Sequence, residues 1–170
     1  MTKALSTEVT VRFAVEEDLF YIRDLYNYEI LNTTSVYHYE ARTEAQMLAW
    51  YKQKKTNAEP ILVAIAMNKP IGFISYSQFR PWKGFQYTVE YMVHVHPDFQ
   101  SFGVGKMLLK ELCQIAKENS VRMLIGGVDS KNKKGIAFHK SMGFEEVGHL
   151  KEVGFKFEQW LDLLFFQLKL

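Results

Sequence analysis

Two glycines, two positions apart, separate a strand-like segment from a helix-like segment near the middle of the chain. They are Gly103 and Gly105, in the stretch Gln100–Lys106. Because glycine has no Cβ, backbone N–H groups here can come close to a ligand. The N-terminus of the following helix adds unpaired N–H groups and the positive end of a helix dipole. This combination predicts a binding site for a phosphate group.

Two well-known phosphate motifs do not fit this stretch. A Walker A loop requires Gly-Lys followed by Ser or Thr, whereas Lys106 is followed by Met107. A dinucleotide-binding fingerprint requires a third glycine, at Lys106 or Leu108. By itself, the Gly-Val-Gly sequence also fits an ordinary tight turn between a strand and a helix. The interpretation of the glycines therefore depends on the rest of the chain.

The elements on either side of the loop follow from the hydrophobic pattern. Residues alternate from Tyr87 to Val95 as in a half-buried strand, with Glu90 and His94 on the more polar face, and Pro97 ends the strand. Apolar residues then recur at helical spacing from Gly105 to about Asn119. The loop is thus expected between a strand and an amphipathic helix.

The remaining segments predict a mixed α/β sheet covered by helices, in one domain spanning residues 1–170. Thr43 and Gln46 resemble a capping box, and Asn132 and Gly143 suit the two ends of a short helix. The expected strands are Val9–Phe13, Ile61–Ala66, Ile71–Ser77, Arg122–Val128, Glu145–Lys151 and Trp160–Leu168. The expected helices are one opened by Glu16–Asp18 and running to Ile30, one through Met47 and Tyr51, and Lys133–Met142.

Composition excludes several classes of protein. The formal net charge is +2, from 21 basic and 19 acidic residues, which gives no support for nucleic-acid binding. A single cysteine, Cys113, cannot form an internal disulfide, and the N-terminus lacks the apolar run of a signal peptide. No apolar stretch has the length of a membrane span. A cytoplasmic protein is the simplest expectation.

The order Gln100-Ser-Phe-Gly-Val-Gly resembles the pyrophosphate loop of the GNAT superfamily of N-acetyltransferases, which holds the diphosphate of acetyl-CoA. Nearly the whole chain is similar to the phosphinothricin N-acetyltransferase family, whose members acetylate the α-amino group of phosphinothricin, methionine sulfoximine or methionine sulfone. That resemblance implies the GNAT fold, a mixed and mostly antiparallel central sheet with a splayed strand pair, and it also implies acetyl-CoA as cosubstrate and a homodimer. The stretches that carry it are Leu25–Asn27 with Ile30, Gly84-Phe85 with Thr88–Glu90, Val93–Pro97, Asn132 through His139 to Gly143-Phe144, and Val153–Asp162.

The resemblance also implies roles for particular residues. An amine must lose a proton before it attacks a thioester, and Glu90 is the expected general base, directly or through a water molecule. Backbone N–H groups of Val93 or Val95 are expected to stabilise the tetrahedral oxyanion and to pair with the pantetheine arm. His139 is expected beside the sulfur as a general acid or hydrogen-bond donor. An ordinary strand glutamate and an ordinary helix histidine are the alternatives.

Further residues are assigned to the two ligands on the same basis. Gly135 replaces the serine that the family usually carries three residues after its asparagine, and Trp82 replaces the second arginine of an Arg-x-Arg pattern. Arg80 could pair with a substrate carboxylate. Trp82 and Phe85 are alternatively core or dimer residues. The expected acetyl-CoA contacts are Val93, His94, Val95, Gln100, Ser101, Phe102, Gly103, Val104, Gly105, Lys106, Asn132 and Ser141, and the expected substrate contacts are Arg80, Trp82, Lys83, Gly84 and Phe85.

Other functions remain open at this point. The chain could act on a protein N-terminus, a polyamine or an aminoglycoside, or it could sense acyl-CoA without turnover. His94 and His96 could share a strand face as a metal pair, but no second cluster of ligands accompanies them, and no metal is expected. Cys113 has no neighbouring base in the sequence and suits packing better than nucleophilic catalysis.

Overall fold

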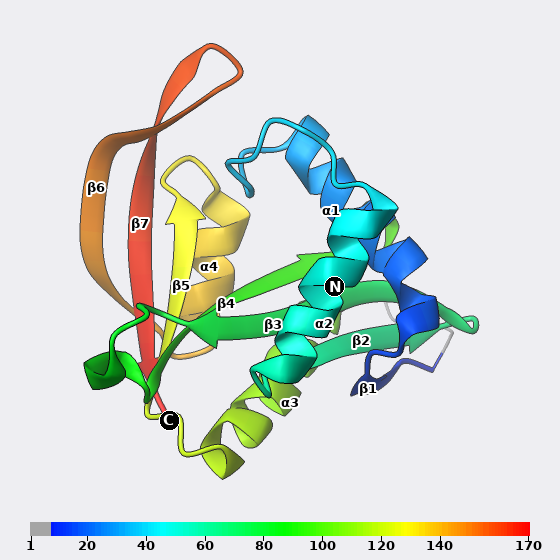
Figure 1. Cartoon of the computed structure of the whole chain (residues 1–170). Coiled ribbons are helices and arrows are strands. Elements are labelled where there is room, and N and C mark those ends of the chain that lie inside the picture. Colours follow the sequence, from blue (N-terminus) through cyan, green and yellow to red (C-terminus); the bar gives the residue numbers. More distant parts are fainter. Residues whose placement is uncertain (1–7) are drawn as a thin grey trace.

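The computed structural model describes residues 8–170 as a seven-stranded sheet with helices on both faces (Figure 1). The strand order is β1-β2-β3-β4-β5-β7-β6, and within the described residues only β4 and β5 pair in parallel. The predicted mostly antiparallel α/β sheet is confirmed. The strands are β1 (Thr10–Phe13), β2 (Ile61–Ala66), β3 (Lys69–Gln78), β4 (Thr88–Val95), β5 (Met123–Asp129), β6 (Glu145–Lys156) and β7 (Gln159–Lys169).

The central strands β4 and β5 pair only where they begin. Their Cα partners run from Thr88 opposite Met123 to Glu90 opposite Ile125. Beyond Glu90, β4 stays paired with β3, whereas β5 stays paired with β7. Figure 1 shows the two strands diverging from this point. The result is the predicted splayed pair, in which one edge of each strand is open to a ligand.

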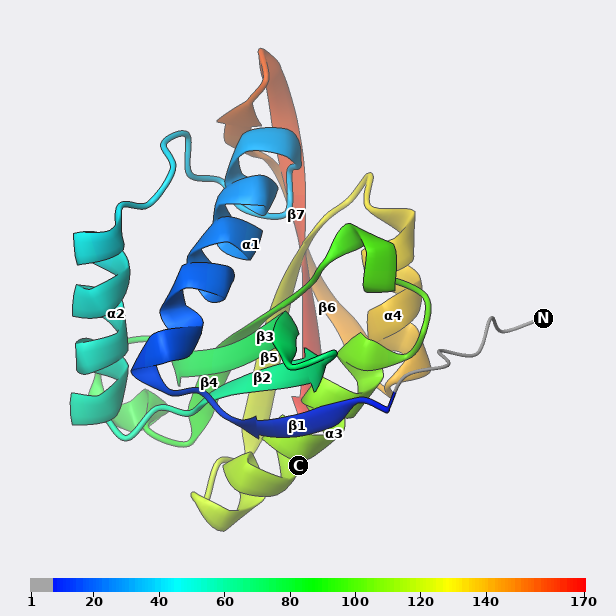
Figure 2. The same cartoon turned by 90° about the vertical axis from the view of Figure 1, so that its right-hand side faces the viewer.

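Helices cover both faces of the sheet, as Figure 2 shows. On one face α1 packs on β3, β4 and α2, and on the other face α3 packs on β2, β3 and β4. The shorter α4 packs on β5. No helix within residues 8–170 is long and apolar enough to cross a membrane. The helices are α1 (Leu19–Asn32), α2 (Glu44–Thr56), α3 (Val104–Glu118) and α4 (Lys133–Ser141).

Two apolar clusters hold these layers together, one on each face. The larger joins α3 to the sheet through Leu108, Leu112 and Val89, and the smaller joins α1 and α2 to the sheet through Ile22 and Phe73. Burial of such side chains contributes about 1.5–3 kcal/mol each. Strand β4 therefore lies between two packed layers along part of its length.

The predicted half-buried character of β4 is wrong at His94. Its imidazole is buried between Tyr26 of α1 and Phe73 of β3, with ring centroids 5.4 and 5.3 Å away. Burial lowers the pKa of His94 to about 4, so the ring is neutral at pH 7. The alternating pattern placed His94 on the more polar face of the strand. The burial of this face by α1 and α2 cannot be inferred from the sequence of β4 alone.

Local capping signals are confirmed. The Thr43 hydroxyl accepts from the Gln46 N–H, and the Gln46 side chain accepts from the Thr43 N–H, so both halves of the capping box are present. The Asn132 side chain accepts from the Gly135 N–H at the start of α4. Gly143 follows α4 with a φ of +84°, as a C-terminal glycine should. These ends were predictable because each depends on neighbours in sequence.

The last hairpin is longer than predicted. Strand β6 continues from Lys151 to Lys156, and its pairing with β7 is interrupted between Glu146 and Gly148 and again between Leu150 and Gly154. A residue inside the second interruption, Glu152, has a φ of +52°. Such bulges break the alternation from which strand length is predicted. The extra length brings Lys156 into the interior, where it is buried.

Candidate active site

A cavity of about 1590 Å³ runs across the opening between β4 and β5. It extends from the segment after α1, past the open edge of β4, to the start of α3 and the inner side of α4. All predicted catalytic and acetyl-CoA residues line it, although they come from three separate segments, β4, the loop that leads into α3, and α4 with its cap. They are Glu90, Val93, His94, Val95, Gln100, Ser101, Phe102, Gly103, Val104, Gly105, Lys106, Asn132, His139 and Ser141.

The glycine-rich loop turns directly into α3. Gly103 has a φ of +85°, and Ser101 also has a positive φ, of +68°. The Gln100 side chain donates to the Val95 carbonyl at 3.2 Å, which ties the loop to the end of β4. The first N–H groups of α3 lack intrahelical acceptors and lie at the cavity wall. This arrangement suits a diphosphate, because a helix N-terminus favours negative charge.

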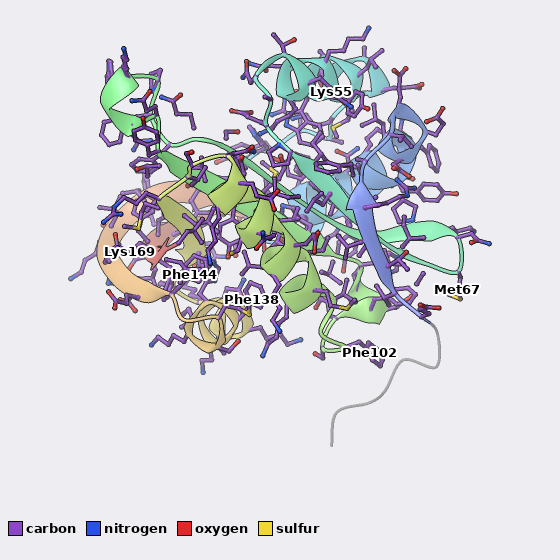
Figure 3. The ribbon with its side chains drawn as sticks, turned by 90° about the horizontal axis from the view of Figure 1, so that it is seen from below. Lys55, Met67, Phe102, Phe138, Phe144 and Lys169 are labelled. Carbon is purple, nitrogen blue, oxygen red and sulfur yellow. The ribbon has the colours of Figure 1, made fainter. Side chains whose placement is uncertain are left out.

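The two glycines of this loop differ in backbone conformation and in their surroundings. Gly103 adopts a left-handed conformation, and a Cβ there would meet nothing within 4 Å. Gly105 lies inside α3, where a Cβ would be 3.4 Å from the Phe138 ring. Figure 3 shows Phe138 beside α3. Gly103 therefore shapes the turn, whereas a Cβ at Gly105 would only make an ordinary van der Waals contact with Phe138.

The open edge of β4 presents backbone groups of alternate residues. The His96 N–H donates to the Ile71 carbonyl at 2.8 Å, and the Thr88 carbonyl accepts from Phe79, so even-numbered residues face β3. Because peptide groups alternate along a strand, Val93 and Val95 face the opening. The peptide of His94 faces β3. His94 nevertheless lines the cavity, and its contact with acetyl-CoA remains a prediction.

Glu90 occupies the point where β4 and β5 separate. A Cβ on Gly127 of β5 would lie 3.6 Å from its Oε1 atom, so the carboxylate reaches across to β5. Among the described residues, the carboxylate has no hydrogen-bond or ion-pair partner. Burial raises the pKa of Glu90, and the charge of Arg80 lowers it in part. A half-buried, unpaired carboxylate with a raised pKa has the properties of a general base.

His139 is buried beneath the cavity and stacks on Phe166, with ring centroids 5.0 Å apart. Its Nδ1 atom is 2.8 Å from the Gly135 carbonyl, so Nδ1 carries the proton. Burial lowers the pKa of His139, which keeps the ring neutral, and Nε2 then accepts from the Tyr91 hydroxyl at 2.8 Å. The proton at this pair is therefore the one on Tyr91, which the sequence indicated only as a strand residue.

Gly126 of β5, which has no side chain, leaves space for the hydrogen-bonded pair of Tyr91 and His139. A Cβ on Gly126 would lie 2.4 Å from Nε2 of His139 and 3.0 Å from the Tyr91 ring. No real Cβ contact is that short, so any side chain at position 126 would displace the imidazole. The glycine could have been noticed in the sequence, but its neighbour on α4 could not.

Asn132 and Ser141 lie at the two ends of α4. Asn132 caps the helix, and a Cβ on Gly135 would be 2.9 Å from its Nδ2 atom. A side chain at position 135, such as the serine that the resemblance predicts, would therefore require the Asn132 side chain to shift. Ser141 is exposed and donates to the Phe138 carbonyl at 2.8 Å. Both residues line the cavity, and their contacts with acetyl-CoA remain predictions.

The predicted substrate segment lies outside the cavity lining. Lys83, Gly84 and Phe85 form a short 3-10 turn between β3 and β4, and the whole segment is exposed. Trp82 and Phe85 are 65% and 37% exposed, which excludes them from the core. The Arg80 guanidinium lies over the Phe79 ring, 4.2 Å from its centroid. Of the five predicted residues, Arg80 has a link to the site, through its charge acting on Glu90.

Sequence reasoning missed the wall of the cavity opposite α3. It consists of Thr33–His38, the segment that follows α1. The Lys156 ammonium donates to the Thr33 carbonyl at 2.7 Å and to the Val36 carbonyl at 2.5 Å. The Thr34 hydroxyl donates to the Asp129 carboxylate at the end of β5. The wall is thus held by side chains from the far end of the chain, and its own sequence shows only a helix stop.

The two histidines considered as a metal pair are separated by their surroundings. His94 is buried, whereas His96 has left the strand and accepts from the Asp98 N–H at 3.3 Å. Within residues 8–170, no three His, Cys, Asp or Glu side chains form a group suited to a metal ion.

A splayed sheet with a carboxylate at the split, and a glycine-rich loop before a helix, defines a class of acyltransferase folds. The model of the acetyltransferase (GNAT) family matches residues 23–144. The chain therefore belongs to the GNAT acetyltransferase family, as the resemblance implied.

Known relatives cover nearly the whole chain. It is 35% identical to the L-methionine sulfoximine/L-methionine sulfone acetyltransferase of Salmonella typhimurium, over 95% of each chain. It is also similar to a solved phosphinothricin acetyltransferase from Sinorhizobium meliloti in complex with acetyl-CoA, at 32% identity and a TM-score of 0.92, over 95% of this chain and 88% of that one. A solved ribosomal-protein-alanine N-acetyltransferase from Brucella melitensis is similar at 38% identity and a TM-score of 0.93, over 95% and 99% of the two chains.

Proposed function

We propose that this protein transfers the acetyl group of acetyl-CoA to the α-amino group of a small amino acid such as methionine sulfoximine, methionine sulfone or phosphinothricin. The observation that carries the proposal is the unpaired, half-buried Glu90, which lies in one cavity with the N-terminus of α3. The relatives from Salmonella typhimurium and Sinorhizobium meliloti support this acceptor class by their activities. Glu90 would remove the proton that prevents the amine from attacking.

The hydrogen-bond donors that line the cavity suit the diphosphate and the pantetheine arm of acetyl-CoA. The loop and the first turn of α3 would bind the diphosphate, and the open edge of β4 would pair with the pantetheine arm. In direct attack, the amine nitrogen bonds to the thioester carbon while Glu90 takes a proton from the nitrogen. The N–H of Val93 or Val95 would then donate to the oxyanion, a contribution typically worth about 3–4 kcal/mol.

The leaving thiolate of CoA needs a proton or a hydrogen bond. We assign this role to His139, as predicted, together with Tyr91. Because Nδ1 donates to the Gly135 carbonyl, the Nε2 atom of the neutral His139 ring is an acceptor, so the hydroxyl of Tyr91 is the group that can turn toward sulfur. Replacement of His139 by Gln keeps a group that can bond Tyr91, whereas replacement by Leu does not. Turnover should therefore fall further for His139→Leu than for His139→Gln.

Measurement of free-thiol release tests the acceptor class. The panel contains methionine sulfoximine, methionine sulfone, phosphinothricin, and a peptide with an N-terminal alanine. The peptide represents a second candidate, a protein α-amine, which the similarity to the Brucella melitensis protein supports. We expect the amino acids to be acetylated. Acetylation of the peptide alone would favour the second candidate, and acyl-CoA binding without turnover of any acceptor would favour a sensor.

A homodimer and a cytoplasmic location remain predictions. Support for an interface comes from large apolar side chains exposed on the β6–β7 hairpin and beside η2 (Lys83–Phe85). Trp82 and Trp160, for example, are 65% and 59% exposed, and apolar side chains grouped on a surface are typical of an interface. Light scattering of the purified protein would give the mass in solution and decide the oligomeric state.

A further inference from the structure

A second cavity, of about 430 Å³, lies between α1, α2 and the sheet. It adjoins the large cavity, because Tyr26, His38 and Met92 line both. Its lining contains a guanidinium, two amides and an imidazole, and it contains no carboxylate. The other lining residues are Arg42, Gln46, Met47, Ala49, Trp50, Gln53 and Phe73.

The polar end of this cavity consists of hydrogen-bond donors. Asn27 holds the backbone of Arg42 through two hydrogen bonds: its Oδ1 atom accepts from the Arg42 N–H at 2.7 Å, and its Nδ2 atom donates to the Arg42 carbonyl at 3.0 Å. The Arg42 guanidinium donates to His38 Nε2 at 2.9 Å. Because guanidinium only donates, the neutral His38 ring must carry its proton on Nδ1. Gln46 already accepts from the Thr43 N–H through its oxygen, so its NH₂ group remains to donate.

Arg42 lacks an acidic neighbour. Within residues 8–170, Arg12, Arg23 and Lys54 form ion pairs with carboxylates, whereas Arg42 forms none. Its strongest described polar contact is with a neutral imidazole. A half-buried guanidinium with free donors favours a ligand that supplies oxygen acceptors.

The rest of the second cavity is apolar and leads toward Glu90. Trp50 and Phe73 meet edge to face, with centroids 6.4 Å apart, and Met92 completes the wall. Met92 and Glu90 lie on the same face of β4, two residues apart, which is roughly 6.5 Å along a strand. That distance is about the length of a four-atom amino-acid side chain. An apolar path therefore connects the proposed base to a cluster of donors.

We propose that the second cavity binds the side chain of the acceptor amino acid, with Arg42 binding oxygens at its tip. This inference rests on the proposed function and deepens it. With the α-nitrogen at Glu90, the methylene groups would lie against Met92 and Trp50. A sulfone, sulfoximine or phosphinate would then accept from Arg42. Arg80 lines neither cavity, but its charge acts on Glu90, and its guanidinium suits the α-carboxylate.

The test compares acceptors that differ only at the tip of the side chain. Arg42→Met keeps the stem of the residue and the backbone bonds to Asn27, and it removes the guanidinium. We expect the ratio of kcat/KM for methionine sulfone or phosphinothricin to kcat/KM for norleucine to fall about 10- to 100-fold. Arg42→Lys should restore part of the loss for phosphinothricin. Arg80→Met should lower kcat/KM for all these amino acids alike, because all carry the α-carboxylate.

A second variant blocks the cavity without removing a charge. Ala49 is an exposed residue of α2 that lines it, and Ala49→Leu keeps a good helix former. We expect the ratio of kcat/KM for methionine sulfone to kcat/KM for alanine to fall at least fivefold. If both ratios stay unchanged while amino acids are acetylated, the side chain lies elsewhere and this inference is wrong. If the unsubstituted protein acetylates no amino acid, the proposed function fails and the inference fails with it.

Discussion

The two halves of the large cavity are built in different ways. The half around α3 consists mainly of backbone groups from one continuous stretch, Gln100–Lys106, and of the open edge of β4 beside it. The opposite half consists of side chains and of the segment Thr33–His38, held in place by residues 95 to 123 positions away. A site made of local backbone is specified by a few glycines. A site made of distant side chains is specified by the whole fold.

The largest expected effect concerns Glu90, where the two halves meet. Glu90→Gln should lower kcat by at least about 100-fold and leave the affinity for acetyl-CoA nearly unchanged, because general-base catalysis contributes about 10²–10⁴-fold. Steady-state kinetics and calorimetry measure the two quantities. A loss confined to cofactor affinity would mean that Glu90 belongs to the α3 half instead. The exposed carboxylate of α2 provides a control, since Glu44→Gln should change neither quantity.

The pKa of Glu90 gives this prediction a pH dependence. Because burial raises that pKa, activity should rise with pH as the carboxylate loses its proton. Stability should instead fall as pH rises. A carboxyl group whose pKa is raised in the folded state contributes its full stabilisation below its pKa in the unfolded state, and it loses this contribution as pH rises through its pKa in the folded state. At neutral pH, Glu90→Gln should therefore be at least as stable to urea as the unsubstituted protein. Equal pH profiles for both proteins would argue against this role.

Replacement of Lys156 tests whether the wall Thr33–His38 depends on the hydrogen bonds that this distant residue donates to it. Lys156→Met removes two charged hydrogen bonds from a buried position, which should lower the free energy of unfolding by about 2–4 kcal/mol. Urea denaturation measures this loss. At a temperature where the variant stays folded, KM for the acceptor should rise several-fold, whereas the dissociation constant of acetyl-CoA should not. A rise in both would show that the two halves are coupled.

The same contrast explains what could be predicted from the sequence. The loop, its strand and helix, the cap at Asn132 and the positive φ at Gly143 depend on near neighbours, and the structure confirms them. The resemblance placed Glu90 and His139 in one cavity. The partner of His139, Tyr91, was missed because it is 48 positions away and no local pattern indicates the contact.

The misses share a physical cause. The burial of His94 depends on α1, the length of β6 is hidden by irregular pairing, and the wall after α1 depends on Lys156 and Asp129. In each case the deciding neighbour lies far away in the chain. Periodicity reports which face of a segment is apolar, and it does not report which element covers that face.

Gly103 tests the α3 half by a smaller change. Gly103→Ala forces an alanine into a φ of +85°, which should cost about 1 kcal/mol, since nothing near the site obstructs a Cβ. The affinity for acetyl-CoA should fall several-fold, and KM for the acceptor should change little. Calorimetry with acetyl-CoA measures the first and steady-state kinetics the second. An unchanged affinity would mean that the diphosphate does not lie against this loop.

The smallest effect is expected at Tyr37, in the wall opposite α3. Its hydroxyl is buried and, among the described residues, has no hydrogen-bond partner, and burial together with Asp129 and Asp162 raises its pKa. An unpaired buried hydroxyl costs free energy in the folded state, so Tyr37→Phe should leave stability unchanged or raise it by up to about 1 kcal/mol.

Tyr39 supplies the matched control, because its hydroxyl donates to the Phe155 carbonyl. Tyr39→Phe removes this hydrogen bond and should lower the free energy of unfolding by up to about 1 kcal/mol. The two variants should therefore change the free energy of unfolding in opposite directions. Parallel urea titrations measure that difference. Destabilisation by Tyr37→Phe would reveal a partner for its hydroxyl and a wall more tightly bonded than its described contacts indicate.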